Sequence, residues 1–270
     1  MRAGTIASEY GEFLKHDPLT RLDWQIVCRW LPDLQSDASI SKVIEFGCGN
    51  GRTLIPLIQR GYQCVGVDLS MPMLREMEKS FHQISDTLTS QETAYSRSRL
   101  TSIQANLVQL ECLQENSVDH AVCLFSTLGM IRHERYRRQF LDHARRIIRT
   151  DGKFILHAHN VWSQLRDRGG AQWFTKHLVD VARKRNEFGD RFSDYRGIRN
   201  MFIHSFRKRE LNQLLRGSGF TVQETYPVTR ALLDQIESFN IDDQTAVAEA
   251  IDRCHSGGMF KTIGWIVVCQ

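Results

Sequence analysis

Short apolar runs that alternate with helix-length segments limit the fold of this chain more than any other feature of its sequence. Five runs precede residue 160, and each is five to seven residues long and ends at glycine or polar residues. Runs of this kind are typical of buried strands in a parallel sheet. They cover residues 42–46, 64–68, 100–105, 119–125 and 153–159. Strands that alternate with helices predict a doubly wound α/β sheet.

The regular alternation of apolar runs and helical segments ends in the second half of the chain. An amphipathic helix predicted at 205–220 precedes an apolar run at 221–228, and a helical stretch at 229–253 separates that run from the last one, at 261–269. Two closing strands without a βαβ crossover predict an antiparallel end to the sheet. We therefore expect a seven-stranded, mostly parallel α/β sheet with an antiparallel terminal strand and helical insertions.

The composition argues against a membrane-spanning or secreted protein. No apolar run approaches the roughly 20 residues that span a bilayer, and the N-terminus lacks the apolar stretch of a secretory signal. Seven cysteines stand without a CxxC pair or a regular spacing, which is typical of reduced thiols. We expect a cytoplasmic protein.

Positive charge is concentrated in one stretch, although the formal net charge is only +4. Residues 132–149 contain seven arginines against Glu134 and Asp142. Such a stretch is either a solvated helix face, which we favour, or a face that binds anions or nucleic acid.

Gly47, Gly49 and Gly51 stand at alternate positions directly after the first apolar run. Glycines at a strand-to-helix turn let the backbone approach a ligand closely, although a tight turn that binds nothing is the simpler alternative. A dinucleotide-binding loop has its third glycine three positions after the second, where this chain has Arg52. A P-loop is excluded as well, because no Gly-Lys-Ser/Thr follows.

Two carboxylates accompany the glycines. Asp68 ends the second apolar run, where a carboxylate can accept hydrogen bonds from both hydroxyls of a ribose. Glu45 lies inside the first run, two residues before Gly47, so its charge faces a buried edge. A backbone amide or a helix end is the simplest partner for Glu45, and it is compatible with a ligand nearby.

Residues 43–74, VIEFGCGNGRTLIPLIQRGYQCVGVDLSMPML, resemble the cofactor-binding half of the class I S-adenosylmethionine-dependent methyltransferases. Members of that family have an acidic residue, then GxGxG, then an acidic residue that ends the second strand, and an S-x-x-M-L helix start. The resemblance extends over roughly residues 40–160, with weaker support at 200–228. It implies a Rossmann-like fold and S-adenosyl-L-methionine as the cofactor.

The resemblance also implies the residues of the cofactor site. Gly47 and Gly49 line the methionine part and Asp68 holds the ribose, while Asn106 stands where the family usually has an aspartate that contacts the adenine amine. Because an amide oxygen can still accept a hydrogen bond, we expect Asn106 to keep this contact with less charge. The implied cofactor residues are Glu45, Gly47, Cys48, Gly49, Gly51, Asp68, Leu69, Asn106, Leu107, Phe125 and Ser126.

Residues that follow the fourth and fifth strands are the candidates for acceptor binding and catalysis. His159 is the candidate general base or substrate contact, with a structural histidine as the alternative. His157 shares its face of the strand, but no further ligand is evident, so we expect no metal. The candidate substrate contacts are Thr127, Met130, Asn160 and Trp162.

The length of 270 residues suits one large domain with insertions. Aromatic and basic residues alternate between 160 and 200, where they either stack bases and hold phosphates or, as we favour, form the small core of a lid. The expected parts are an N-terminal helical cap at 1–40, a cofactor-binding core at 41–160, an insertion or lid at 161–204, and the rest of the same sheet at 205–270 with a helical insertion at 229–260.

Three functions fit these features. We expect methyl transfer to an oxygen or nitrogen nucleophile of a small molecule, because residues 125–131, FSTLGMI, resemble those of small-molecule methyltransferases. No Asn/Asp-Pro-Pro-Tyr/Phe motif follows the fourth strand, which argues against amino-methylation of adenine or glutamine. A tRNA methyltransferase of the wobble-uridine type is the alternative, since residues 204–211 resemble a motif of those enzymes. A non-catalytic regulatory protein that binds S-adenosylmethionine is the third. The expected partner is therefore a small molecule, or RNA in the alternative, and not a membrane.

Overall fold

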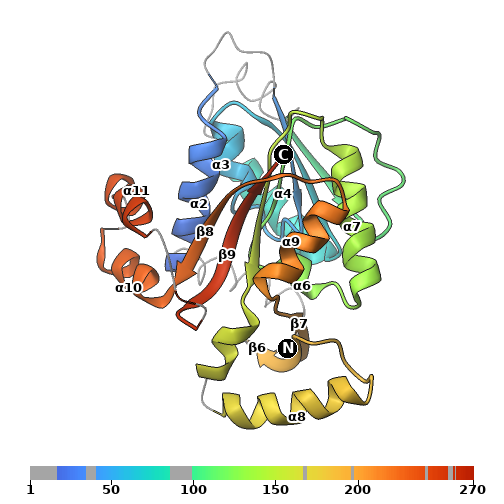
Figure 1. Cartoon of the computed structure of the whole chain (residues 1–270). Coiled ribbons are helices and arrows are strands. Elements are labelled where there is room, and N and C mark those ends of the chain that lie inside the picture. Colours follow the sequence, from blue (N-terminus) through green and yellow to red (C-terminus); the bar gives the residue numbers. More distant parts are fainter. Residues whose placement is uncertain are drawn as a thin grey trace.

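One seven-stranded sheet forms the centre of the molecule, in the strand order β3-β2-β1-β4-β5-β9-β8 (Figure 1). The computed structural model describes residues 17–34, 41–85, 99–166, 169–195, 198–240, 243–254, 258 and 260–270. The strands of the sheet are β1 (Lys42–Phe46), β2 (Gln63–Asp68), β3 (Leu100–Gln104), β4 (His120–Cys123), β5 (Phe154–His159), β8 (Val222–Thr229) and β9 (Thr262–Cys269).

The pairing of the strands confirms the expected fold class. β1 to β5 run parallel, and β9 pairs antiparallel with both β5 and β8. Each apolar run of the sequence overlaps one strand. The fourth strand is shorter than expected, because Phe125 and Ser126 have positive φ angles of 54° and 60° and the backbone leaves the extended conformation before them.

Helices cover both faces of the sheet, and none of those in the described ranges is long and apolar enough to cross a membrane. On one face lie α2 (Pro18–Trp30), α3 (Leu54–Gln59), α4 (Met71–Ser85), α10 (Arg230–Ser238) and α11 (Gln244–Arg253), and on the other α7 (Glu134–Ile147) and α9 (Lys208–Gly217) (Figure 1). α7 packs its apolar stripe on the sheet, where the rings of Phe140 and Phe46 meet edge to face at 5.1 Å.

The helical stretch predicted at 229–253 forms two helices rather than one. Arg21 of α2 donates hydrogen bonds to the carbonyls of Ile236 and Phe239, at 2.7 and 3.2 Å, and so satisfies the end of α10. The Asp243 carboxylate then caps α11 by accepting from the Ala246 amide at 2.9 Å. Of the cap predicted at 1–40, only residues 17–34 are described.

Residues 161–204 leave the sheet after β5 and form a layer of their own, at the bottom of Figure 1. Trp162 packs against Phe174 and Phe188, with ring centroids 6.0 and 5.8 Å apart, so these rings form a small core. The boundaries of the four parts stay a prediction. The insertion consists of η1 (Val161–Arg166), α8 (Gly170–Ala182) and the hairpin β6 (Asp190–Tyr195) and β7 (Ile198–His204).

Candidate cofactor and substrate site

A cavity of about 960 Å³ lies at the carboxyl ends of β1, β2 and β4. The strand order reverses between β1 and β4, and this is where open α/β sheets bind ligands. Nine of the eleven residues expected to bind the cofactor line the cavity, all except Gly51 and Ser126, and so do Thr127 and Met130. Ligand pockets measure about 300–1,000 Å³, so this one is large enough for a cofactor and a small acceptor.

Gly47 brings the backbone of the loop after β1 close to the opposite wall of the cavity. Its φ is +76°, and a Cβ at this position would overlap the Thr127 side chain. The amides of Gly47 and Cys48 both donate to the Val67 carbonyl, at 2.8 and 3.1 Å, which ties the loop to β2. The loop is therefore held open toward the cavity by backbone contacts that a side chain would disturb.

Asp68 is held in place by the same loop. Its two carboxylate oxygens accept from the amides of Gly49 and Ser70, each at 2.8 Å. Each oxygen has a second lone pair, so the carboxylate can still accept from a ligand in the cavity. The Asp68 carboxylate is thus oriented before any ligand arrives.

Asn106 lies beyond the end of β3 and also faces the cavity. Its side-chain oxygen accepts from the Val108 amide at 3.2 Å, which leaves one lone pair and the amide nitrogen for a ligand. Leu69 is 68% exposed and lines the cavity beside it, together with Leu107. The polar side chain of Asn106, with apolar Leu69 and Leu107 beside it, suits a flat heterocyclic ring that has polar atoms at its edge.

Two ionisable side chains, those of Glu45 and Arg52, line the cavity. Burial raises the pKa of Glu45 to about 8, although the nearby Arg52 guanidinium opposes this shift. Glu45 Oε2 has no hydrogen-bond partner among the described residues. Arg52 pairs with the buried Asp23 of α2 at 3.1 Å and lies over the Phe125 ring at 5.5 Å. An unpaired carboxylate oxygen at this depth suits a cationic group of a ligand.

The wall opposite the glycine loop has an unusual backbone. Phe125, Ser126 and His133 all have positive φ values, of 54°, 60° and 70°. Non-glycine residues rarely adopt this conformation, and such residues cluster at binding and catalytic sites. This wall also contains Arg132 and Tyr136, which the sequence reasoning did not assign to the site.

Five of the predicted site residues do not line the cavity. Gly51 is buried against Met77 of α4, where a Cβ would overlap the methionine side chain. Ser126 Oγ accepts from the His159 amide at 3.2 Å. Asn160 donates to the Thr262 carbonyl at 2.7 Å, and Trp162 belongs to the small core of the insertion. Their roles toward cofactor and substrate stay predictions.

His159 is the fifth of these residues. Its ring packs against His157, with centroids 5.2 Å apart. Burial lowers the pKa of His159 to about 3, and the neighbouring His157, whose own pKa is lowered to about 3 by burial, adds to the shift. Both rings are therefore neutral near pH 7, and His159 is a weak proton acceptor.

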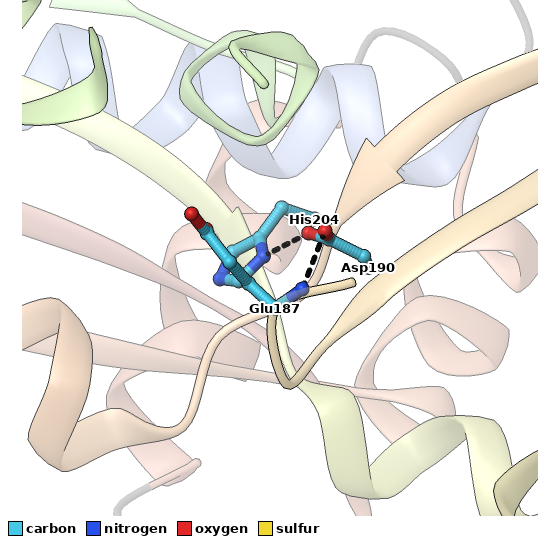
Figure 2. Close-up of side chains that lie close together, drawn as sticks. All are labelled: Glu187, Asp190 and His204. Atoms are coloured by element: carbon cyan, nitrogen blue, oxygen red, sulfur yellow. Dashed lines mark hydrogen bonds and ion pairs between the residues drawn. The ribbon is translucent and has the colours of Figure 1, made fainter. Parts of the chain in front are cut away.

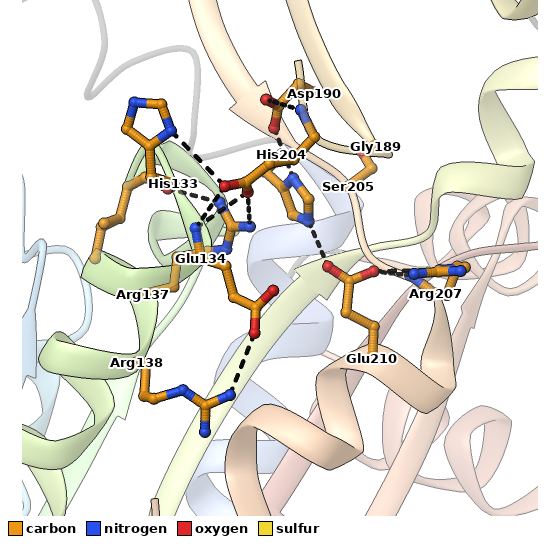
Figure 3. Close-up of polar contacts among 12 residues, drawn as sticks. His133, Glu134, Arg137, Arg138, Gly189, Asp190, His204, Ser205, Arg207 and Glu210 are labelled. Carbon is orange, nitrogen blue, oxygen red and sulfur yellow. Dashed lines mark hydrogen bonds and ion pairs between the residues drawn. The ribbon is translucent and has the colours of Figure 1, made fainter. Parts of the chain in front are cut away.

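A buried histidine joins the insertion to the body of the molecule (Figure 3). His204 of β7 has Asp190 Oδ1 2.8 Å from Nδ1 and Glu210 Oε1 2.8 Å from Nε2. Burial alone would lower the pKa of His204, but the hydrogen bonds to the two carboxylates outweigh it and raise the pKa. The three residues come from β6, β7 and α9, so this contact links the hairpin to the helix.

Glu187, between α8 and β6, makes a second link beside the first. Its carboxylate accepts from the buried Arg137 of α7 at 2.6 Å. Both of its oxygens also accept from the Glu134 amide, at 2.9 and 3.0 Å, and so cap the start of α7. The insertion therefore holds the cavity wall at residues 131–136 in place.

Glu187, Asp190 and His204 each offer a ligand atom, and these atoms lie within 4.8 Å of one another (Figure 2). A metal ion there would have to replace existing contacts, because Arg137 neutralises Glu187 and the His204 nitrogens face two carboxylates. The donor set is already satisfied as an ion-pair network. The expectation of no metal stays a prediction.

Comparisons with known proteins agree with this geometry. No curated protein matches the chain. Among solved structures, a methyltransferase from Methanosarcina mazei that depends on S-adenosylmethionine is 16% identical, with a TM-score of 0.62 over 91% of this chain and 96% of that one. The 1,6-didemethyltoxoflavin-N1-methyltransferase of Burkholderia thailandensis is 14% identical, with a TM-score of 0.58 over 98% and 83% of the two chains. The CcbJ methyltransferase of Streptomyces caelestis is also 14% identical, with a TM-score of 0.57 over 93% and 89%.

Sequence identities of 14% to 16% with these solved structures show that the fold is shared, and no more than that. A model of the methyltransferase domain family matches residues 20–225, which is about three quarters of the chain. The cavity also fits the cofactor of that family, since Asp68 and Glu45 both line a space bordered by the glycine loop. The chain therefore belongs to the methyltransferase domain family, and it is a class I methyltransferase that depends on S-adenosylmethionine.

Proposed function

We propose that the protein transfers the methyl group of S-adenosylmethionine to an oxygen or nitrogen nucleophile of a small molecule. The observation that carries this proposal is the single cavity of about 960 Å³, in which the cofactor motif forms one side and residues 124–136 form the other. A pocket of this size accommodates a cofactor and a small acceptor side by side. The methyltransferase from Burkholderia has a small acceptor, 1,6-didemethyltoxoflavin, bound with S-adenosylhomocysteine.

Each polar part of the cofactor has a complementary group in the chain. Asp68 accepts from the ribose hydroxyls, as its fixed orientation between two backbone amides favours. Asn106 contacts the adenine edge between Leu69 and Leu107. The unpaired oxygen of Glu45 accepts from the methionine ammonium group, which also compensates for the burial of this carboxylate.

The bound cofactor supplies an already activated methyl group, so the main task of the chain is alignment. Phe125, Thr127 and Met130 form the wall beside the reacting groups and hold the acceptor against the cofactor. His159, with a pKa of about 3, is a weak base and lies outside the lining of the cavity. An acceptor that reacts without a strong general base therefore fits the site best.

An RNA substrate is less well supported, because the arginine-rich stretch at 132–149 is not a free basic face. Six of its seven arginines donate hydrogen bonds to other described residues. Arg146, for example, donates to the carbonyls of Leu110 and Leu113, and Arg149 pairs with Asp119. These contacts use the donors that would otherwise bind phosphates.

Calorimetry with S-adenosylhomocysteine tests the cofactor site. We expect the wild-type protein to bind, and Asp68→Ala to weaken binding about tenfold or more, because charge-assisted hydrogen bonds to the ribose are lost. Asp252→Ala is the matched control, since this carboxylate is exposed and pairs only with Arg29 in the described part of the chain. Equal losses in both variants, or no binding by the wild type, would contradict the assignment.

Transfer from labelled cofactor into a cell extract tests the acceptor. We expect label in the small-molecule fraction after protein and RNA have been removed. Label in the RNA fraction, with binding that weakens steeply as salt increases, would instead support the tRNA alternative. Binding of S-adenosylhomocysteine without transfer to any fraction would support the non-catalytic alternative.

A further inference from the structure

We propose that Arg132 binds an acidic group of the methyl acceptor, so that the substrate is a small molecule with a carboxylate or a phosphate. This inference rests on the proposed function, because it places the acceptor at the end of the cavity opposite the glycine loop. Four observations carry it: the free donors of Arg132, the rings that orient it, the charge of the cavity and the apolar groups around it.

Arg132 differs from the other arginines of the 132–149 stretch. It has no hydrogen bond and no carboxylate partner among the described residues, although its side chain lines the cavity. Its guanidinium donors are therefore available to a ligand. The six arginines with partners are Arg135, Arg137, Arg138, Arg145, Arg146 and Arg149.

The insertion orients Arg132. Its guanidinium lies over the rings of Phe192 and Phe202, 5.5 and 5.9 Å from their centroids, and these residues face each other on β6 and β7. Aromatic faces attract a guanidinium without occupying its N–H groups, so the side chain is positioned while its donors stay free. The capping of α7 by Glu187 fixes the backbone directly after this residue.

The charge of the cavity is divided between its two ends. Glu45 in β1 and Asp68 at the end of β2 are the acidic residues that line it in the described part of the chain, and they belong to the proposed cofactor end. Arg52 lies at this end as well, where it pairs with Asp23. At the other end Arg132 lies next to His133 and Tyr136, with no carboxylate in the lining. The Glu187 carboxylate lies close to His133 but outside the lining, and it is already paired with Arg137. The Arg132 cation therefore favours an anion, and guanidinium binds carboxylate or phosphate through two parallel hydrogen bonds.

Apolar groups surround this cation. Met130, which is 44% exposed, and Ile131 line the cavity next to Arg132, and Phe192, which is 39% exposed, lies under the Arg132 guanidinium outside the lining. Exposed side chains of this size next to a binding cavity suit an apolar ligand body. The acceptor is therefore best described as an apolar acid of small size.

Minimal ligands test this site without turnover. Ligand-observed NMR would be recorded for benzoate, phenyl phosphate and neutral benzamide with the protein saturated by S-adenosylhomocysteine. We expect an acid to bind and benzamide not to bind. Arg132→Gln should abolish binding of the acid, Arg132→Lys should keep part of it, and Arg138→Gln should leave it unchanged because Arg138 pairs with Glu134 and does not line the cavity.

Transfer of label tests the same site in the reaction. A small-molecule extract would be divided on an anion exchanger, and each fraction incubated with labelled cofactor. We expect the acceptor in the retained, acidic fraction, and a loss of about tenfold or more in transfer by Arg132→Gln. S-adenosylhomocysteine should bind this variant as it binds the wild type, since Arg132 lies away from the cofactor motif.

The outcomes separate this inference from the proposed function. Transfer to the unretained fraction, or undiminished transfer by Arg132→Gln, would overturn the acidic-group site and leave small-molecule methylation intact. Label in RNA, or no transfer by a protein that binds S-adenosylhomocysteine, would overturn both. Binding of neither acid by the wild type would overturn the site as well.

Discussion

Glu45 is a carboxylate whose environment favours its protonated form until a cation arrives. Its pKa is raised to about 8 by burial, and one of its oxygens has no partner among the described residues. The proposed contact with the methionine ammonium group requires the ionised form. Cofactor binding should therefore release a proton near neutral pH.

The affinity for S-adenosylhomocysteine should accordingly rise with pH between 6 and 8, by up to tenfold per unit, and level off above the pKa of about 8. Calorimetry across this range, in buffers with different ionisation enthalpies, measures both the affinity and the proton release. Glu45→Gln should bind more weakly with a flat pH profile. A slope that persists in this variant would assign the proton to another group.

Two glycines of the loop after β1 allow the cost of a strained backbone to be distinguished from the cost of a steric overlap. Gly47→Ala combines a positive φ with overlap of Thr127, whereas Gly49→Ala has only the positive φ of 54°, with no atom near its Cβ. We expect Gly47→Ala to lower stability by about 2 kcal/mol or more and Gly49→Ala by about 1 kcal/mol. Gly258→Ala, where a Cβ meets open space, is the control. Denaturant unfolding measures the free energy of unfolding of each variant. Equal losses for Gly47→Ala and Gly49→Ala would show that the overlap with Thr127 costs nothing.

At the scale of elements, the insertion is attached to the sheet by charge as well as by packing. In its protonated form His204 balances the carboxylates of Asp190 and Glu210, while Arg137 and Arg207 lie close to the same group. Because the folded pKa of His204 is raised, its stabilising contribution is complete below the ordinary value of 6.5 and is lost as pH rises through the raised value.

Hydrogen exchange tests this attachment. After correction for intrinsic rates, amides of α8, β6 and β7 should lose protection as pH rises above the ordinary histidine value of 6.5, while those of β1 and β2 should not. Glu210→Gln should move the transition to lower pH, because one of the two hydrogen bonds that raise the pKa of His204 is weakened. His82→Gln, on an exposed face of α4, is the control. Uniform protection across the range would contradict the prediction.

At the scale of the whole molecule, local patterns were sufficient for the sheet and the cofactor loop. Each strand is a contiguous apolar run, and Gly47, Asp68 and Asn106 follow the ends of such runs, so neighbouring residues carried the information. The partners of Arg52 and Arg132 could not be found this way. Asp23 is 29 residues from Arg52, and Phe192 and Phe202 lie in an insertion whose placement depends on tertiary contacts.

Tertiary contacts that the sequence does not reveal also explain why His159 and Asn160, at the end of β5, do not line the cavity. His159 and Asn160 occupy the edge of the sheet where ligands bind, but β9 and the segment after β7 cover this part of it. Asn160 donates to the Thr262 carbonyl, and the His159 carbonyl accepts from the Phe206 amide at 2.8 Å. Sequence position indicates the correct edge of a sheet. It does not indicate which strand ends later segments have covered.

β9 follows β8 in the chain, yet it lies between β5 and β8 in the sheet. During synthesis, β8 has no native partner strand until residues 262–269 have emerged, and β5 keeps an unpaired edge for the same period. Such edges pair readily with other chains, and closure that depends on distant segments is slow. The synthesis of β9 therefore ends the period in which the edges of β5 and β8 are open to pairing with other chains.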